Sequence, residues 1–179
     1  SGKGKSTLVD IISGLIRPNH GEIIVDKKKI NNTNLISWRS KFSYVPQKVF
    51  LFDDTILNNI ILGNNLNTNI KKKDLNFAIE ASRLDKFINN KPSKLNFKIK
   101  GNGMNISGGQ RQRIGIARCI YYNKDIIIFD EATSGLDKKT EKELLKIIFG
   151  LKNKKTIIII SHNEDIIKKC NNYIDLDNF

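Results

Sequence analysis

Runs of apolar residues along the chain predict the strands of a buried sheet. Residues 126–129 and Thr156–Ile160 are continuous apolar or β-branched runs, as expected of strands covered on both faces in a parallel sheet. Phe42–Val45 forms a third candidate strand that ends before Pro46, and residues 22–25 form a short fourth one. These runs favour a parallel sheet at the centre of the fold.

Between these runs, apolar residues recur at helical spacing. The spacing predicts helices over residues 8–16, 114–121 and 139–149, the last with Gly150 as its stop. Residues 58–90 are also helical in pattern, but they are more polar. Strands that alternate with helices in this way are typical of an α/β fold, in which helices cover both faces of the sheet.

The composition fits one globular domain, or a core with a subdomain. The chain has 179 residues, of which 39% are hydrophobic and 27% charged, enough to bury a sizeable core. No apolar run approaches the roughly 18–20 residues that cross a bilayer, and no signal peptide is visible, so neither is expected here. The two cysteines, Cys119 and Cys170, are far apart and in no metal-binding spacing, so we expect both to be reduced and buried.

The net charge of +13 permits two interpretations. One is binding to nucleic acid or to an anionic membrane surface. The other is a bias of composition toward lysine, asparagine and isoleucine, without a partner. The second is favoured, because the lysines are dispersed and form no basic stripe interleaved with aromatic residues. No nucleic-acid partner is expected.

The first residues of the chain carry phosphate-binding chemistry. They form the end of a Walker A loop, Gly-x-x-x-x-Gly-Lys-Ser/Thr, so we expect the chain to be an N-terminally truncated piece. A flexible terminus is the alternative, disfavoured because a helical pattern follows at once. Lys5 is expected to reach the β- and γ-phosphates of a nucleotide, and Ser6 to ligate Mg²⁺. The predicted nucleotide-binding residues of this loop are Gly2, Lys3, Gly4, Lys5, Ser6 and Thr7.

Two acidic residues follow the apolar run at 126–129, which is a Walker B pattern. Ligands of open α/β sheets gather at the carboxyl ends of the strands, where Asp130 and Glu131 are expected. Asp130 suits coordination of Mg²⁺, and Glu131 suits polarisation of the attacking water. An apolar run that ends in two acidic residues is common on its own. A Walker B strand is indicated here because the same chain also carries a Walker A loop.

Residues 105–113, Asn-Ile-Ser-Gly-Gly-Gln-Arg-Gln-Arg, indicate the family. A hydroxyl and two glycines at a helix start suit phosphate oxygens, and here they lie between the Walker A and Walker B motifs. The run resembles the signature motif of ATP-binding cassette proteins, usually Leu-Ser-Gly-Gly-Gln, with Ile106 in place of the leucine. The resemblance implies that this motif contacts ATP through Ser107, Gly108, Gly109 and Gln110.

The resemblance to the ATP-binding cassette family extends over essentially the whole chain. Residues 44–47 look like the Q-loop, in which Gln47 would contact Mg²⁺ and the attacking water. Residues 134–137 look like the D-loop, with glycine in place of the usual alanine, and Asp137 would lie at the nucleotide. His162 looks like the switch histidine that contacts the γ-phosphate. Glu131, His162 and Gln47 are thus the predicted catalytic residues, and Ser6, Gln47 and Asp130 the predicted metal ligands.

The resemblance also implies an architecture. Residues 1–179 would be a partial nucleotide-binding domain of P-loop NTPase type, with the N-terminal antiparallel strands and the adenine-stacking aromatic missing. A RecA-like parallel-sheet core at about 1–47 and 119–179 would carry an inserted α-helical subdomain at about 48–118. Two such domains would sandwich two ATP molecules, each site joining the Walker motifs of one to the signature motif of the other.

The kind of cassette protein is indicated by residues 43–60. This segment, with residues 35–39 and 101–105, resembles exporters that fuse membrane and ATPase domains. Residues 50–52 would line a groove for a coupling helix, although core packing also explains them. We therefore expect an exporter ATPase domain at the cytoplasmic face of a plasma or inner membrane, with a transmembrane domain upstream. Its partner would be a second nucleotide-binding domain, identical or different.

Two other functions remain open at the level of sequence. A soluble cassette ATPase acting on nucleic acid or ribosomes is the main alternative, whereas a chromosome-structure protein is disfavoured because no long coiled coil separates the Walker motifs. A non-catalytic binding module is opposed by the intact Lys5, Asp130, Glu131 and His162. The transported substrate cannot be read from this chain.

Overall fold

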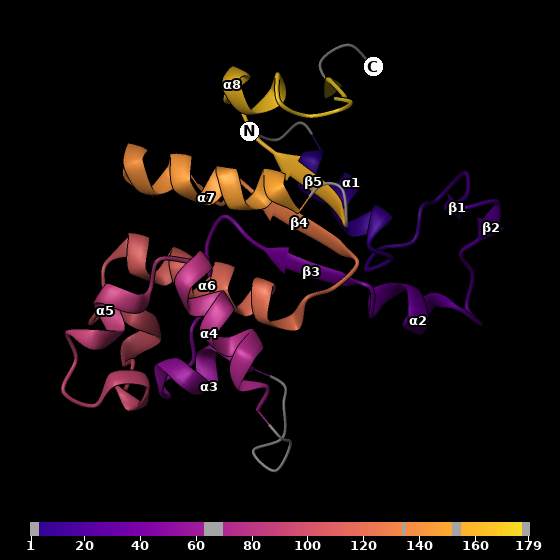
Figure 1. The fold of residues 1–179 in the computed structure, drawn as a ribbon. Coiled ribbons are helices and arrows are strands. Elements are labelled where there is room, and N and C mark those ends of the chain that lie inside the picture. Colours follow the sequence, from indigo (N-terminus) through magenta and orange to yellow (C-terminus); the bar gives the residue numbers. More distant parts are fainter. Residues whose placement is uncertain (1–3, 63–69, 134, 152–154, 177–179) are drawn as a thin grey trace.

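The centre of the fold is a parallel three-stranded sheet (Figure 1). The computed structural model describes residues 4–62, 70–133, 135–151 and 155–176. β3 (Phe42–Val45), β4 (Ile126–Asp130) and β5 (Thr156–Ile160) lie in the order β3-β4-β5, with all neighbours parallel. Tyr44 pairs with Ile128 in this register. The predicted α/β class and the parallel sheet are confirmed.

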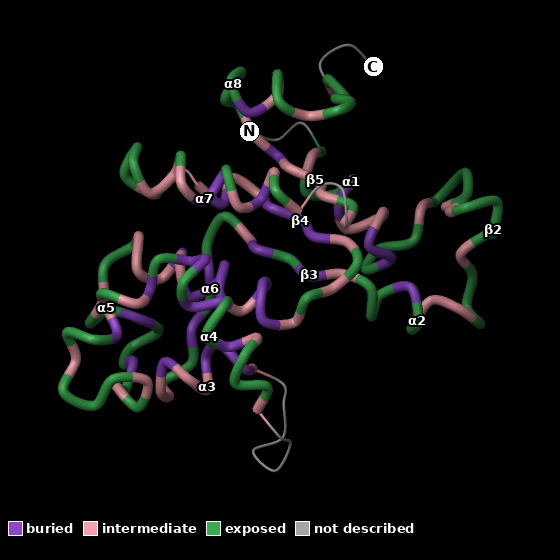
Figure 2. Tube along the Cα trace, viewed as in Figure 1, coloured by how far each residue is buried: buried purple, intermediate pink, exposed green. Residues whose placement is uncertain are grey.

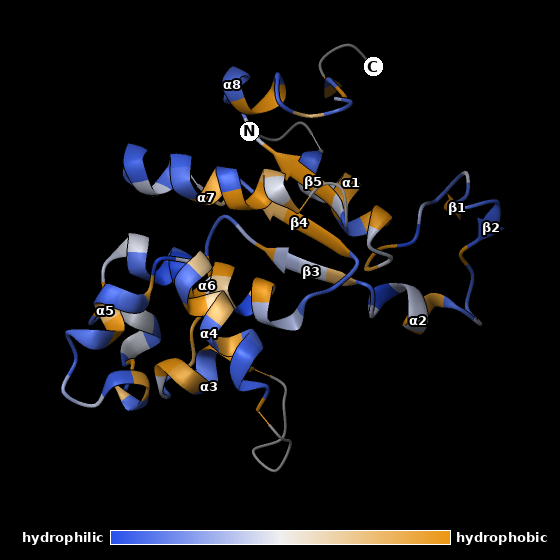
Figure 3. Ribbon diagram, viewed as in Figure 1, coloured by the Kyte–Doolittle hydropathy of each residue, from blue (hydrophilic) through white to orange (hydrophobic). Residues whose placement is uncertain are grey.

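Helices cover both faces of this sheet, because successive strand residues point to opposite sides. On one face, Val9 of α1 (Lys5–Ile12) packs with Ile128 and Ile160. On the other face, α7 (Lys138–Gly150) packs against the odd-numbered residues of β4 as part of the main core. Figure 3 shows β4 and β5 as hydrophobic, β3 as intermediate, and much of α7 as hydrophilic. α8 (Glu164–Ile167) follows β5.

The strand predicted at residues 22–25 is shorter and lies outside the central sheet. β1 (Ile24–Val25) pairs antiparallel with β2 (Lys28–Lys29) in a separate hairpin. Asp26 and Lys27 connect the two strands with φ values of +48° and +64°, as a tight two-residue hairpin turn requires. α2 (Leu35–Arg39) follows this hairpin and leads into β3.

A helical region lies between β3 and β4 in sequence. Its elements are α3 (Ile56–Ile60), α4 (Lys72–Ala81), α5 (Asp85–Asn89), the short 3₁₀ turns η1 (Lys94–Asn96) and η2 (Gly101–Gly103), and α6 (Gly108–Tyr122). α6 packs against both α3 and α4 and also against β3. Buried residues concentrate on α6, α4 and β4 (Figure 2). The predicted subdomain boundary at residue 118 falls inside α6, and the subdomain division stays a prediction.

Several local expectations can be compared directly with the structure. α7 ends at Gly150, as predicted, whereas α6 begins at Gly108 and so includes polar residues ahead of the predicted start at 114. Cys119 and Cys170 are both outside any disulfide, and Cys119 is buried, but Cys170 is only partly buried, so the prediction of burial is wrong there. Among the described residues, no helix combines the length and the apolar character needed to span a membrane.

Candidate functional site

The start of α1 presents the end of the Walker A loop. Gly4 precedes the helix with φ of +76°, a left-handed conformation that glycine adopts without a steric penalty. Ser6 and Thr7 are exposed in the first turn, where the backbone N–H groups lack partners within the helix and attract anions. Gly2 and Lys3 lie outside the described residues.

Four predicted site residues from four separate segments meet in one cluster. Lys5 Nζ lies 3.2 Å from Nε2 of His162, which follows β5. The same His162 nitrogen lies 3.3 Å from Oε1 of Glu131, immediately after β4. Gln47, after β3, donates from Nε2 to the second oxygen of Glu131 at 2.6 Å. The carboxyl ends of the three strands therefore bring the Walker A lysine, the Walker B glutamate, the Q-loop glutamine and the switch histidine together.

The backbone at the end of β4 fixes the position of Glu131. Its φ is +46°, which few non-glycine residues adopt, and its N–H donates to the carbonyl of Ile160 on β5 at 3.0 Å. Asp130, the last residue of β4, accepts a 2.8 Å hydrogen bond on Oδ2 from the hydroxyl of Tyr44 on β3. The two carboxylates thus stand side by side with different partners.

The three predicted metal ligands, Ser6, Gln47 and Asp130, carry the oxygen donors that suit a magnesium ion. Mg²⁺ prefers oxygen ligands and is usually held by one or two carboxylates together with substrate phosphates. Asp130 supplies a carboxylate whose hydrogen bond to Tyr44 uses only Oδ2, Ser6 supplies an exposed hydroxyl, and Gln47 supplies an amide oxygen. The donor set therefore fits the ion, although the ligand roles themselves stay predictions.

The signature segment opens α6 with a reciprocal capping box. Ser107 Oγ accepts from the backbone N–H of Gln110 at 3.2 Å, and the side-chain oxygen of Gln110 accepts from the Ser107 N–H at 3.0 Å. Ser107 and Gly108 are exposed. The described side-chain hydrogen bonds of Ser107 and Gln110 thus run to each other, within the start of α6.

Asp137 has a local structural role in the described chain. It is the N-cap of α7, and its carboxylate accepts from the backbone N–H of Thr140 at 3.0 Å and from the Thr140 hydroxyl at 2.6 Å. The hydrogen bonds from Thr140 hold the pKa of Asp137 below its usual value. The predicted contact of Asp137 with a nucleotide stays a prediction, and Ser134 of the D-loop lies outside the described residues.

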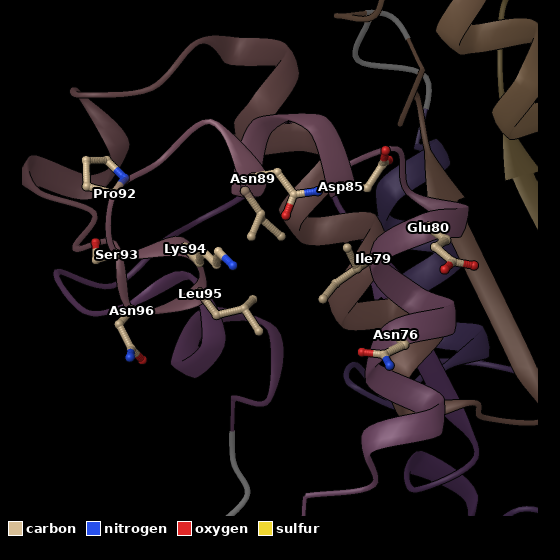
Figure 4. Close-up of a pocket in the computed structure, with 11 residues that line it drawn as sticks. Asn76, Ile79, Glu80, Asp85, Asn89, Pro92, Ser93, Lys94, Leu95 and Asn96 are labelled. Carbon is tan, nitrogen blue, oxygen red and sulfur yellow. The ribbon is translucent and has the colours of Figure 1, made fainter.

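A separate pocket of about 460 Å³ lies in the helical region, away from this chemistry. Figure 4 shows α4 side chains such as Ile79 and Glu80 on one wall and Lys94, Leu95 and Asn96 on the other. None of the predicted site residues that the structure describes lines it.

One contact at the site is not predicted from the sequence, namely that of Tyr44 with Asp130. The sequence singles out Tyr44 only as part of the Q-loop string. The signal that could have found it is the position of Tyr44 in its strand. Residues two apart in a strand share a sheet face, and the strand that holds Tyr44 ends beside the Walker B strand.

Comparisons with known proteins agree with this geometry. The family model described as ABC transporter matches residues 1–134. The chain is 36% identical over 99% of its length to an ATP-dependent lipid A-core flippase of Cupriavidus pinatubonensis, of which it covers 30%. It is 41% identical over 99% of its length to the lactococcin-G-processing and transport ATP-binding protein LagD of Lactococcus lactis, of which it covers 25%.

A solved structure shows the same fold. A bacterial Atm1-family ABC exporter with ATP bound superposes with a TM-score of 0.85 at 32% identity, over 93% of this chain and 29% of that one. The chain thus spans less than a third of the length of these relatives. From the motifs, the convergence of their side chains and these matches, we conclude that the chain belongs to the ABC transporter family.

Proposed function

We propose that the chain is the ATP-binding and ATP-hydrolysing domain of an exporter-type ABC transporter. The observation that carries this proposal is the convergence of Lys5, Gln47, Glu131 and His162 at the carboxyl ends of three parallel strands. These groups come from four segments far apart in the sequence, and together they supply a phosphate-binding cation, a carboxylate base and its two orienting partners. A non-catalytic binding module would have no use for this set.

Each residue has a chemical task in this reaction. Lys5 and the N-terminus of α1 hold the phosphate chain, while Ser6, Asp130 and Gln47 provide the oxygen ligands for Mg²⁺. The chemistry that Mg²⁺ would supply there, when bound, is neutralisation of the negative charge on the phosphate oxygens. Glu131 orients the attacking water and accepts its proton, and Gln47 and His162 hold the two carboxylate oxygens in place. His162, beside Lys5, also lies where it can donate to the γ-phosphate.

A second nucleotide-binding domain is needed to complete each site. The capped start of α6 exposes Ser107 and Gly108, and its capping hydrogen bonds run between Ser107 and Gln110. A helix start of this kind attracts phosphate oxygens. We propose that it contacts the ATP held by the Walker motifs of the partner domain, so that Ser107, Gly108, Gly109 and Gln110 act in trans.

The exporter assignment is supported by an exposed aromatic surface near the Q-loop. Phe50 and Phe52 are 55% and 46% exposed and pack edge to face at 5.0 Å between ring centroids, while Leu51 between them is buried. Core packing thus accounts for Leu51 only. Exposed apolar patches mark interaction sites. We propose that this pair receives a segment of a transmembrane domain, which would hold the chain at the cytoplasmic face of a plasma or inner membrane.

The alternative, a soluble ATPase acting on nucleic acid or ribosomes, is less well supported. The relatives named above are described as a flippase, a transport protein and an exporter, at 32–41% identity. No specific observation in the described structure favours a nucleic-acid partner.

Replacement of Glu131 by glutamine tests the proposed reaction in the complete protein. The amide keeps the shape but cannot accept a proton, so ATP turnover is expected to fall by about 10² or more, the scale of a general-base contribution. ATP binding should persist, because Lys5 and the start of α1 are unchanged. Glu164→Gln is the matched control, since Glu164 is exposed and pairs with Lys168 one turn away. Near-normal turnover in Glu131→Gln would remove this residue from the role of base.

A further inference from the structure

The side chain of Tyr44 links the Q-loop strand directly to the Walker B aspartate. In the parallel register Tyr44 lies opposite Ile128, and Asp130 is two residues further along β4 on the same face. The phenol spans this diagonal, and its hydroxyl donates to Oδ2 of Asp130 at 2.8 Å. The contact therefore follows from strand register and joins residues that are far apart in the sequence.

The ring of Tyr44 has an apolar setting that is separate from its hydroxyl. It lines a cavity of about 180 Å³ between α1 and the sheet, together with Val9, Phe42 and Ile128, and the residue is 41% exposed. The hydroxyl bonds to the carboxylate of Asp130. A phenylalanine at this position keeps the same apolar contacts and loses only the donor.

The hydrogen bond from the neutral Tyr44 hydroxyl to Oδ2 of Asp130 affects how the other carboxylate oxygen, Oδ1, is oriented. The Tyr44 hydroxyl restricts rotation of the carboxylate but does not cancel its negative charge. With Oδ2 engaged, Oδ1 is the oxygen left to face a cation. Groups that orient a metal ligand in this way tune metal affinity as well as position, typically by 10–100-fold when they are removed.

We propose that Tyr44 is a positioning residue that orients Asp130 for Mg²⁺ and thereby sets how strongly Mg²⁺ promotes nucleotide binding. This proposal rests on the proposed function, in which Asp130 is a metal ligand. Tyr44 does not touch the reacting atoms. It acts through Asp130 alone, so its effect disappears wherever Asp130 cannot hold the ion.

The test compares nucleotide affinity with and without the ion in the complete protein. The Kd of a fluorescent ATP analogue is measured in Mg²⁺ and in excess EDTA, and the ratio of the two values is the Mg²⁺ gain. For Tyr44→Phe, the Mg²⁺ gain is expected to fall by about tenfold, the lower end of the range for orienting groups. The Kd in EDTA should stay within about twofold, because the phosphate-binding residues are unchanged.

Two further variants separate this effect from loss of structure and from failure of the proposed function. Tyr122→Phe removes a hydroxyl that donates to the carbonyls of Ile61 and Leu62 in the helical region, and its Mg²⁺ gain should be normal. Asp130→Asn should abolish most of the Mg²⁺ gain by itself, and Tyr44→Phe added to it should change nothing more. If Asp130→Asn leaves the gain intact, the proposed metal site fails.

The proposal for Tyr44 has its own contrary outcomes. If Asp130→Asn loses the Mg²⁺ gain but Tyr44→Phe keeps it, Tyr44 does not position the ligand. A larger gain in Tyr44→Phe would mean that the hydroxyl competes with the ion, which also overturns the proposal. If Tyr44→Phe raised the Kd in Mg²⁺ and the Kd in EDTA by the same factor, the role of Tyr44 would be structural, and the proposal would be wrong.

Discussion

Gly115 in α6 is the described glycine at which an added Cβ would meet its nearest neighbour at the shortest distance. A Cβ at this residue would lie 2.5 Å from Cγ2 and 2.9 Å from Cγ1 of Val49, whereas ordinary contacts lie at 3.4–4 Å. Val49 is 3% exposed and follows the Q-loop closely, so it has little room to move. Gly115→Ala therefore forces the helix and the Q-loop segment apart.

The expected magnitude combines two opposing effects. Overpacking of a dense core costs about 1–3 kcal/mol. Alanine also favours a helix interior over glycine by about 1 kcal/mol. Gly115→Ala alone should therefore destabilise the region by about 0–2 kcal/mol, a range too wide to test the reasoning. Its combination with Val49→Ala is sharper, because that change removes both clashing methyl groups at a cost of about 1–3 kcal/mol by itself.

The double variant should be more stable than the sum of the single effects predicts. The clash exists only when the methyl group added at position 115 and the methyl groups of Val49 are both present. The coupling free energy should therefore equal the clash, about 1–3 kcal/mol in favour of the pair. Gly150→Ala in α7 is the matched control, because nothing lies within 4 Å of an added Cβ there. Gly150→Ala should leave the free energy of unfolding unchanged or raise it slightly. Its effect should add to that of Val49→Ala without a coupling free energy.

Cys119 provides the assay, because it lies on α6 one turn after Gly115. It is buried, and burial raises the pKa of its thiol to about 12, so alkylation requires local or global opening. The complete protein is equilibrated in increasing urea and pulsed with an alkylating reagent, and labelling at Cys119 is quantified by mass spectrometry. Additivity within about 0.5 kcal/mol would refute the steric reasoning.

Two other predictions concern the shared site and a pH-sensitive contact. In forced mixed dimers of full-length Lys5→Ala and Ser107→Arg copies, a site shared in trans collects both lesions and leaves the second site intact. Such dimers should occlude about one nucleotide, and each parent dimer almost none, whereas equal trapping would contradict sharing. The backbone N–H groups of Asn102 and Gly101 hold the pKa of Asp53 below its usual value. Because the folded pKa is the lower one, this stabilisation is present above about pH 4, the unfolded value, and is lost as pH falls through the folded pKa. Hydrogen exchange at the Asn102 amide, corrected for intrinsic rates, should follow this loss, and Asp53→Asn should flatten it.

The strands and the cluster at their carboxyl ends could be predicted from the sequence for a simple physical reason. Strands buried on both faces consist of apolar residues without interruption, as at residues 126–129, and parallel strands end at one edge. Residues that directly follow such strands, here Gln47, Glu131 and His162, must therefore converge. Their meeting also needs these three strands to be neighbours in one sheet, and the structure shows this order.

Features that depend on tertiary packing were missed. In α6 the apolar periodicity begins only at residue 114, whereas the Ser-Gly-Gly sequence before it predicts the helix opening that the capping box at Ser107 forms. The burial of Gln112 and its 3.4 Å hydrogen bond to the Pro46 carbonyl have no such local signal. The bond from Tyr44 to Asp130 depends on register between strands that are distant in sequence, so no local pattern reveals it.

The arrangement around His162 suggests why nucleotide binding and hydrolysis are connected. One ring nitrogen, Nε2, lies 3.2 Å from the Lys5 ammonium and 3.3 Å from the Glu131 carboxylate. With a proton it donates to Glu131, and without one it accepts from Lys5, so it satisfies one neighbour at a time. A phosphate oxygen accepts from both Lys5 and His162 and so removes this conflict. In the proposed reaction, binding of the γ-phosphate would thus weaken the contact between His162 and Glu131 and so connect nucleotide binding to the base.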